Sequence, residues 1–351
     1  MRKLNFLCSE LSGTGGTETV LIKVLNHLVN NYEITLTLSN IPEEKEWLEK
    51  IDTRVKINMF RGKGNISKLL FILRSFLFEK NTDYISLSPK MVLLGSKIKK
   101  FLNKKYQVIS WFHLSLATQD VFDTQNTLPY ADGHLAISDI NKRELLKMGI
   151  GEEYIRLIYN PIEKEEILPK VFENSKELNV FYAGRIELGT PKNLRELLNG
   201  INKIENIHLD IYGGGNDLEK SMKLVNDLGI DSKVTWHGWS SELWREIVER
   251  PDALIMTSNS EGFPMIMLES ISRGIPVITS NFDGYDSILK ENINGYSYEL
   301  GNIESMKNAI EKLREDRLSP EKIRDSIKKF YSDSYFRKLD KSIEYFISCK
   351  K

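Results

Sequence analysis

The sequence predicts an α/β protein of two domains, each built on a parallel sheet covered by helices. Short apolar runs alternate with helix-periodic segments, and this alternation stops near residue 160 and starts again near residue 180. The 351 residues also exceed what one hydrophobic core comfortably holds. We place the domains at 1–162 and 163–330, and we expect a final helix at 331–351 that packs back on the first domain.

Apolar runs in the first half are predicted as strands, with helical patterns such as Thr17–Asn31 between most of them. The β–α alternation is typical of a parallel sheet with helices on both faces. The predicted strands are Leu4–Ser9, Ile34–Ser39, Val55–Phe60, Tyr84–Ser88, Val108–His113 and His134–Ser138.

A polar linker, Glu163–Glu177, precedes the second alternation, and the chain after Ile303 is charged and helix-periodic. Two such α/β units would enclose an interdomain cleft, a favoured place for ligands. The strands predicted in this half are Val180–Ile186, His208–Gly215, Val234–Trp239, Ala253–Ser258 and Pro276–Asn281.

The composition favours a cytoplasmic protein without a nucleic-acid partner. The 49 basic and 49 acidic residues balance, so no overall positive charge attracts nucleic acid. Cys8 and Cys349 lie far apart without metal-ligand spacing, which fits a reducing compartment. The short apolar run at the N-terminus reads as a first strand and not a signal peptide, and no stretch approaches the roughly 20 apolar residues of a membrane span.

The segment Arg61–Lys105 is strongly basic, with eleven lysines and arginines against Glu79 and Asp83. Within it, Lys68–Lys80 reads as an amphipathic basic helix. Such a helix can lie on an anionic membrane surface, although a buried helix with a solvated charged face is a common alternative. Both interpretations stay open from the sequence.

The most informative segment for function is Ser258–Thr279, in which Glu261 and Glu269 stand eight residues apart where a loop opens into a helix. It follows a buried strand, and ligands of open α/β sheets bind at the carboxyl ends of strands. Gly262 permits close backbone approach, and the free N–H groups of a first helical turn attract anions. Carboxylates beside such a turn suit a ligand rich in hydroxyls and phosphates, such as a nucleotide sugar.

Two cations leave the end of one predicted strand. Arg185 follows Val180–Gly184, and Lys192 lies seven residues later, just before a helix. Together they can neutralise a diphosphate, the guanidinium through paired hydrogen bonds and the ammonium as a point charge. Two solvated surface cations are the alternative.

Three further features are less specific. The glycine-rich loop that contains Gly15 and Gly16 joins the first strand to the first helix, and His113 ends a strand that would point at the same cleft. The run Gly213–Gly215 is interpreted as a turn that closely approaches a ligand or a neighbouring segment. No cluster has the spacing of metal ligands, so we expect no metal and no cofactor.

Together the glycine-rich loop, His113, the Arg185–Lys192 segment and the Glu261–Glu269 block resemble the retaining glycosyltransferases of family 4, which have the GT-B fold of two facing Rossmann-like domains. The resemblance extends over essentially the whole chain. Within the family, the sequence is most similar to bacterial lipopolysaccharide α-1,6-galactosyltransferases.

The resemblance implies roles for the matching residues. Arg185 and Lys192 would hold the donor diphosphate, Glu269 the ribose hydroxyls and Glu261 the donor sugar. Backbone groups of Gly262 and Phe263 would position sugar and phosphate. Gly15 and Gly16 would face the diphosphate from the other domain, and His113 would reach the donor sugar.

The resemblance also implies a reaction. A hexose, galactose before glucose, would move from a UDP-sugar to a glycan or lipid-linked acceptor in lipopolysaccharide, capsule or wall polysaccharide synthesis. Transfer would retain the anomeric configuration without a metal, through front-face attack, with Glu261 as a covalent nucleophile as the alternative. The enzyme would work in the cytoplasm, peripherally on the inner face of the membrane. A nucleotide-sugar 2-epimerase and a non-catalytic partner subunit are the competing interpretations.

Overall fold

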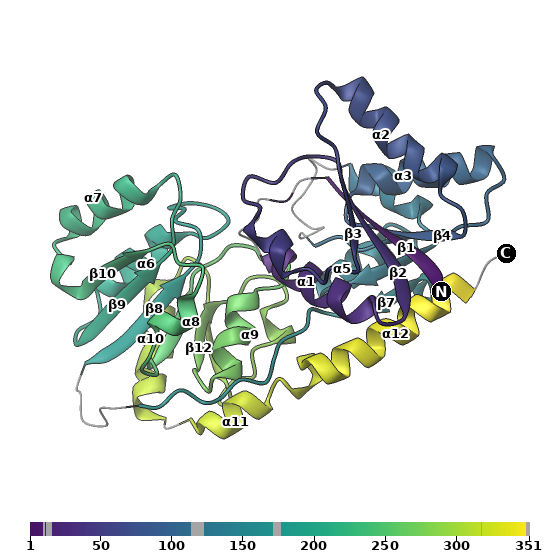
Figure 1. The fold of residues 1–351 in the computed structure, drawn as a ribbon. Coiled ribbons are helices and arrows are strands. Elements are labelled where there is room, and N and C mark those ends of the chain that lie inside the picture. The colour runs from purple at the N-terminus through teal and green to yellow at the C-terminus, as the bar shows by residue number, and fades with distance from the viewer. Residues whose placement is uncertain (10, 12–15, 114–122, 171–176, 317, 349–351) are drawn as a thin grey trace. The chain divides into compact units, whose positions relative to one another are not determined.

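The computed structural model describes residues 1–9, 11, 16–113, 123–170, 177–316 and 318–348. The chain divides into two compact units (Figure 1). One contains Met1–Pro161 together with Asp333–Lys351, and the other contains Ile162–Ser332. The predicted boundaries at 162/163 and 330/331 lie within two residues of these divisions. Each unit is described by itself.

The first unit is a parallel sheet of seven strands with the order β3-β2-β1-β4-β5-β6-β7. Its central strand is buried from Leu4 to Cys8 on both faces, as expected where helices cover both sides of a parallel sheet. The strands are β1 Arg2–Cys8, β2 Tyr32–Leu38, β3 Lys56–Met59, β4 Thr82–Ser86, β5 Val108–Ser110, β6 Gly133–Ala136 and β7 Ile155–Leu157.

The helices of the first unit include the last helix of the chain, which returns to pack against the first. His27 stacks on Phe336 with ring centroids 4.1 Å apart, and its Nε2 lies 2.9 Å from a carboxylate oxygen of Asp340. The helices are α1 Gly16–Leu28, α2 Asn65–Phe78, α3 Pro89–Phe101, α4 Thr124–Thr127, α5 Asp139–Lys147 and α12 Ser332–Ser348, with 3-10 turns at Glu46–Lys50, Leu128–Tyr130 and Glu152–Tyr154.

The second unit is a parallel sheet of six strands with the order β10-β9-β8-β11-β12-β13. Its strands are β8 Leu178–Ala183, β9 Ile207–Tyr212, β10 Val234–Gly238, β11 Ala253–Met256, β12 Val277–Ser280 and β13 Gly295–Tyr298. Its helices are α6 Leu194–Asn202, α7 Leu218–Leu228, α8 Leu243–Glu246, α9 Met265–Ser272, α10 Ile303–Glu315 and α11 Pro320–Asp325, with 3-10 turns at Asp231–Lys233, Tyr285–Ser287 and Lys328–Phe330.

In each sheet the strand order reverses once, between β1 and β4 in the first and between β8 and β11 in the second. Loops that leave neighbouring strands on either side of such a reversal diverge and open a crevice at the carboxyl edge, where open α/β sheets bind ligands. The loop that contains Lys192 follows β8, and the loop that contains Glu261 follows β11. The fold therefore brings these two loops to the reversal of the second sheet.

The predicted parallel α/β organisation is confirmed, with several differences in the strands. The predicted strand Val108–His113 is too long, because β5 ends at Ser110. Likewise β6 ends at Ala136 and β8 at Ala183, each before its predicted end. The strands β7 and β13 were not predicted. Both are edge strands of three or four residues, too short to show an alternating pattern.

The interpretation of Gly213–Gly215 as a closely approaching turn is confirmed, and the neighbour is the chain after β8. Gly213 has φ +148°, and a Cβ atom there would lie 1.9 Å from the carbonyl oxygen of Gly184. The amide of Ile186 donates to the carbonyl of Gly214 over 2.9 Å. The turn after β9 thus supports the backbone on which Arg185 stands.

Candidate functional site

Arg185 follows β8 at the carboxyl edge of the second sheet. Its carbonyl oxygen accepts a 2.6 Å hydrogen bond from the hydroxyl of Tyr182, a buried residue, and this bond holds the chain where it leaves the strand. The guanidinium is 68% exposed and lies 2.9 Å from Oε1 of Glu187. The arginine end of this pair faces solvent while the Glu187 side chain is only 25% exposed, so Arg185 is accessible to the oxygens of an incoming anion.

Lys192 lies in the loop between β8 and α6, and its side chain meets Glu261 from the loop after β11. Its Nζ donates to Oε1 of Glu261 over 2.7 Å, and both side chains are largely buried. The hydroxyl of Thr257 donates to the carbonyl oxygens of Lys192 and Asn193 over 3.1 and 3.0 Å. The two loops are therefore joined through backbone and side chains, and an ammonium and a carboxylate meet between them.

Glu261 is held by a second donor. The hydroxyl of Ser258 donates to the same Oε1 over 2.6 Å. Two donors on one carboxylate oxygen restrict the orientation of the side chain, and hydrogen bonds to an ionised group are the strong ones. Removing either Lys192 or Glu261 would leave the other charge poorly solvated in this largely buried place.

Glu269 lies on α9, eight residues beyond Glu261, and is oriented by a residue that the sequence analysis did not select. The indole Nε1 of Trp244, on the short helix α8, donates to Oε2 of Glu269 over 2.9 Å. The guanidinium of Arg273 lies 4.1 Å above the Trp244 ring, and its Nη1 donates to the carbonyl of Glu269 over 3.0 Å. Phe181 on β8 meets the same indole edge-on at 6.0 Å. A sequence gives little sign of a contact of this kind, because α8 has only four residues.

Gly262 and Phe263 connect Glu261 to α9. The Phe263 side chain is buried and packs edge-on against Phe330 with centroids 5.5 Å apart. Its side chain is therefore structural, and any contribution of these two residues to ligand binding comes from their backbone, as predicted from the sequence. That contribution stays a prediction.

His113 lies just beyond β5 in the first unit. Its ring meets the buried Trp111 ring edge-on, with centroids 4.4 Å apart, and burial lowers the pKa of His113 to about 3. The imidazole is therefore neutral near pH 7. Its Nε2 is buried and has no hydrogen-bond partner among the residues that the structure describes. A neutral imidazole can exchange hydrogen bonds with a hydroxyl group, but it brings no charge to a substrate.

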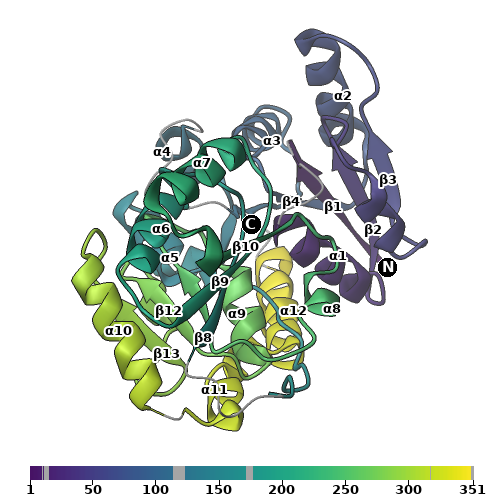
Figure 2. The ribbon, with the colours of Figure 1, turned by 90° about the vertical axis from the view of Figure 1, so that its left-hand side faces the viewer.

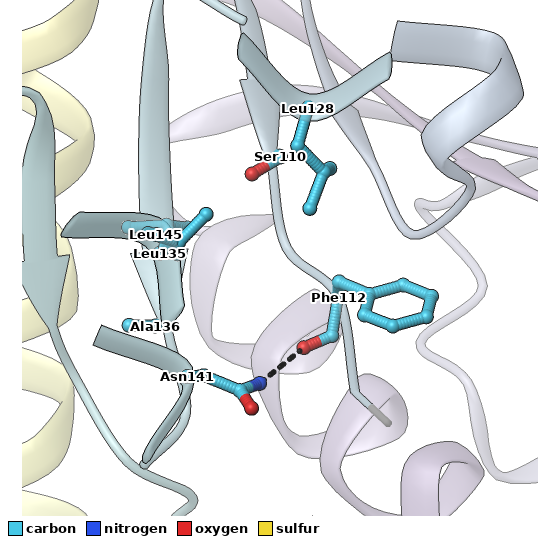
Figure 3. Close-up of a pocket in the computed structure, with 7 residues that line it drawn as sticks. All are labelled: Ser110, Phe112, Leu128, Leu135, Ala136, Asn141 and Leu145. Atoms are coloured by element: carbon cyan, nitrogen blue, oxygen red, sulfur yellow. Dashed lines mark hydrogen bonds between the residues drawn. The ribbon is translucent and has the colours of Figure 1, made fainter. Parts of the chain in front are cut away.

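The backbone before His113 is fixed from the side of α5. The side-chain amide of Asn141 donates to the carbonyl of Phe112 over 3.3 Å, beside a small pocket that Leu128 and Leu135 also line (Figure 3). Its volume of about 10 Å³ leaves room for about one water molecule. The pocket is therefore a packing feature next to His113 and is too small for a sugar.

Only part of the glycine-rich loop belongs to the residues that the structure describes. Gly15 lies outside the described residues, and Gly16 is the exposed first residue of α1. Glu18, two residues later, is buried, and together with burial its charge raises the pKa of the Cys8 thiol. Cys8 is thus a protonated thiol, and Cys349 lies outside the described residues.

Within the second unit, the structure brings Lys192 and Glu261 into direct contact, places Arg185 on the same loop as Lys192, and puts Glu269 on the helix that follows Glu261. His113 and Gly16 belong to the first unit. The second unit alone therefore carries two cations and two carboxylates that follow the neighbouring strands β8 and β11. This arrangement can bind a ligand with both phosphate oxygens and hydroxyl groups.

Comparisons with known proteins identify the family. The sequence profile of the family described as glycosyl transferases group 1 matches residues 163–330. The chain is 31% identical to the lipopolysaccharide 1,6-galactosyltransferase of Escherichia coli K12, over 99% of this chain and 100% of the relative. It is 30% identical to the protein of the same description from Salmonella typhimurium LT2, over 97% and 98% of the two chains.

Solved structures show the same fold. The lipopolysaccharide outer core galactosyltransferase WaaB, in its apo form, matches with a TM-score of 0.83 and 28% identity, over 97% of this chain and 99% of WaaB. Anabaena HepE in complex with UDP matches with a TM-score of 0.81 and 15% identity, over 98% of this chain and 100% of HepE. The second likeness concerns the fold alone. The chain belongs to the group 1 glycosyl transferases and has their GT-B fold.

Proposed function

We propose that the protein transfers a hexose, galactose before glucose, from a UDP-sugar to an acceptor in surface-glycan synthesis. The observation that carries the proposal is the 2.7 Å contact between Lys192 and Glu261 at the strand-order reversal, with Arg185 on the same loop as Lys192 and Glu269 on the following helix. The donor is proposed from the relatives that are named 1,6-galactosyltransferases and from HepE, which was solved with UDP and with UDP-glucose. The acceptor class is lipopolysaccharide, capsule or wall polysaccharide.

Each of the four charged residues would bind the part of the donor that its own charge suits. Arg185 and Lys192 bind the diphosphate, since both are cations on the loop after β8. Glu261 accepts hydrogen bonds from hydroxyls of the sugar, and Glu269 accepts them from the ribose. The exposed Arg185 would exchange its contact with Glu187 for the phosphate, whereas Lys192 and Glu261 would adjust around the contact they already make with each other.

We further propose transfer with retention and without a metal. The bond from the anomeric carbon to the phosphate oxygen breaks, the acceptor oxygen attacks from the same face, and its proton passes to the departing phosphate oxygen. Positive charge grows on the sugar while negative charge grows on the diphosphate. Fixed cations stabilise that diphosphate, and electrostatic stabilisation of this kind is the largest contribution to the rate enhancement of many enzymes. The neutral His113 would contribute a hydrogen bond to the donor sugar.

The cellular place is part of the same proposal. We place the reaction in the cytoplasm, on the inner face of the membrane. The free thiol of Cys8 is compatible with a reducing compartment. In the part of the chain that the structure describes, no helix is both long and apolar enough to cross a bilayer.

The test is turnover of a panel of UDP-sugars with a lipid-linked glycan acceptor, followed by product analysis. We expect glycosylated product with UDP-galactose, at a rate that a chelator does not change. Arg185→Ala and Lys192→Ala should each lower kcat/KM by about 100-fold, which corresponds to about 3 kcal/mol of transition-state stabilisation. Lys220→Ala, which removes an exposed lysine of α7, is the control and should leave the rate unchanged.

The other outcomes of the assay would each indicate a different function or mechanism. An epimerised nucleotide sugar without transfer would indicate an epimerase, and binding without turnover would indicate a partner subunit. Loss of activity with a chelator and recovery with magnesium or manganese would overturn the metal-free mechanism. An inverted product would overturn retention.

A further inference from the structure

The helix α2 is amphipathic in an unusual way, because it carries two apolar stripes. Ile72 and Phe76 form the first stripe, which is buried, and the Phe76 ring lies against Gly95 of α3 and 4.6 Å from the ring of Tyr84. The second stripe follows the spacing i, i+4, i+7, i+11 and consists of Ile66, Leu70, Leu73 and Leu77. Ile66 is 79% exposed and Leu70 is 60% exposed. The amino-terminal half of the second stripe is therefore not covered by the core, while Leu73 and Leu77 are half-buried.

The exposed apolar surface continues at the carboxyl ends of α2 and α3. Lys104, just after α3, donates from Nζ to the carbonyl of Leu77 over 3.0 Å and so ties the two helix ends together. Phe78 at the end of α2 is 72% exposed, and Phe101 at the end of α3 is 88% exposed. We call the exposed face of α2 together with these helix ends the α2–α3 surface. The two helices lie side by side in the first unit, and α2 projects from it (Figures 1 and 2).

Positive charges predominate at the surface of the segment Arg61–Lys105. Asp83 is buried and accepts the amide of Gln107 over 2.8 Å, and Glu79 is half-buried and accepts the side-chain amide of Asn5 over 3.0 Å. Asp83 therefore adds no charge at the surface, and Glu79 offsets at most one of the exposed cations. The exposed cations of the segment are Arg61, Lys63, Arg74, Lys80, Lys90, Lys97, Lys100 and Lys105.

We propose that the α2–α3 surface docks on a bilayer that contains anionic lipid. Exposed cations attract the anionic headgroups, and large apolar side chains between them can enter the boundary between headgroups and acyl chains. A nucleic acid would use the cations but would leave the aliphatic stripe of Ile66 and Leu70 in water. The surface thus has both components of interfacial binding. This goes beyond the proposed transfer reaction and does not depend on it, because vesicle binding is measured without turnover.

The test is flotation of the full-length protein with vesicles of phosphatidylcholine alone or of phosphatidylcholine with phosphatidylglycerol. We expect binding to the anionic vesicles only, and weaker binding as salt is added. Each cation near the surface should contribute roughly fivefold in partitioning. The triple variant Arg74→Gln, Lys80→Gln, Lys105→Gln should therefore bind about 100-fold more weakly.

Two matched variants separate the contributions. The apolar variant Ile66→Ser, Leu70→Ser, Phe78→Ser keeps every charge and should also lose binding. The control Lys203→Gln, Lys220→Gln, Lys223→Gln removes the same charge from exposed positions of the second unit and should bind like the unchanged protein. Thermal unfolding curves of all variants should match that of the unchanged protein, because none of the altered residues is buried.

Several results would overturn the proposal. The protein could fail to bind anionic vesicles, or bind them in a way that salt does not weaken. The control variant could lose as much vesicle binding as the triple variant, or the protein could bind a duplex oligonucleotide more tightly than vesicles. A protein that floats with anionic vesicles but shows no turnover would overturn the proposed function and support the docking surface. The two failures are thus distinguishable.

Discussion

Replacing Trp244 by Phe tests whether the orientation of Glu269 matters for donor binding. The substitution removes the indole N–H that donates to Oε2 of Glu269 over 2.9 Å. It keeps an aromatic ring for the guanidinium of Arg273, 4.1 Å away, and for the edge contact with Phe181. The variant therefore changes one hydrogen bond and little packing.

The expected effect is moderate. A hydrogen bond to a charged group contributes about 1.5–3 kcal/mol to stability. Water can replace part of this contribution in the variant, because Trp244 and Glu269 are only half-buried. We expect a loss of about 1–1.5 kcal/mol in donor binding, which is roughly a fivefold to tenfold increase in KM for the UDP-sugar. The value of kcat should change by less than about twofold, because Glu269 is proposed to bind the ribose and not the reacting centre.

The assay is steady-state kinetics with the donor varied, together with calorimetric binding of UDP. The variants are Trp244→Phe, Glu269→Gln and the double variant. If Trp244 acts through Glu269, the two single effects are not additive, and Trp244→Phe adds little once Glu269 is changed. The control is Trp239→Phe, which alters a tryptophan after β10 that is 60% exposed.

An unchanged KM for Trp244→Phe, alongside a large effect of Glu269→Gln, would refute the positioning role. Strictly additive effects would show that the two residues act independently. A fall in kcat with constant KM would also contradict the reasoning, because it would place Glu269 at the reacting centre. Thermal unfolding identifies a variant that merely folds poorly.

Three other predictions concern Lys192, Gly213 and His113. Lys192→Ala should lower the melting temperature as well as the rate, because Glu261 would keep a largely buried charge without its cation, and Lys192→Arg should recover part of the stability in the same melting experiment. Gly213→Ala should cost more than about 3 kcal/mol in urea unfolding, because its Cβ would lie 1.9 Å from a carbonyl oxygen, while Gly214→Ala, with 3.7 Å of space, should change stability by less than about 1 kcal/mol. The pKa of His113 is about 3 in the folded protein, against 6.5 for an ordinary histidine such as that of the unfolded chain. Between these pH values the unfolded chain binds more protons than the folded protein, so the stability of the fold falls as the pH drops through this range. The loss from this group should be about 2 kcal/mol between pH 7 and pH 5, and urea unfolding of His113→Gln should show a correspondingly shallower acid slope.

The sheet organisation was predictable because it depends on patterns that are local in the sequence. Buried parallel strands are continuous apolar runs, such as Leu4–Cys8, and helices between them have their own period. The ends of strands were less predictable. Trp111 and Phe112 continue the apolar run after β5 but are buried as loop residues, and nothing local distinguishes them from strand residues.

The candidate site was predictable to a different degree. The residues that follow strands, such as Arg185 and Glu261, were visible because a polar residue at the end of an apolar run is conspicuous. Trp244 was not, because its role depends on a contact with a residue 25 positions away, formed from a helix of only four residues. The packing of Gly213 against Gly184 is also long-range, although the glycine run itself indicated a close approach.

The contact between Lys192 and Glu261 changes how the site must work. From the sequence, the lysine belonged to the phosphate and the glutamate to the sugar, as separate functions. In the structure they form one largely buried ion pair, so neither charge can be taken by a ligand without exposing the other. A diphosphate alone would draw Lys192 away and add a second anion near Glu261. A complete nucleotide sugar compensates, because sugar hydroxyls donate to Glu261 while the phosphate takes Lys192. If the donor binds as we propose, the ion pair favours the intact donor over its nucleotide product, and this would give a physical reason why UDP leaves after the sugar has been transferred.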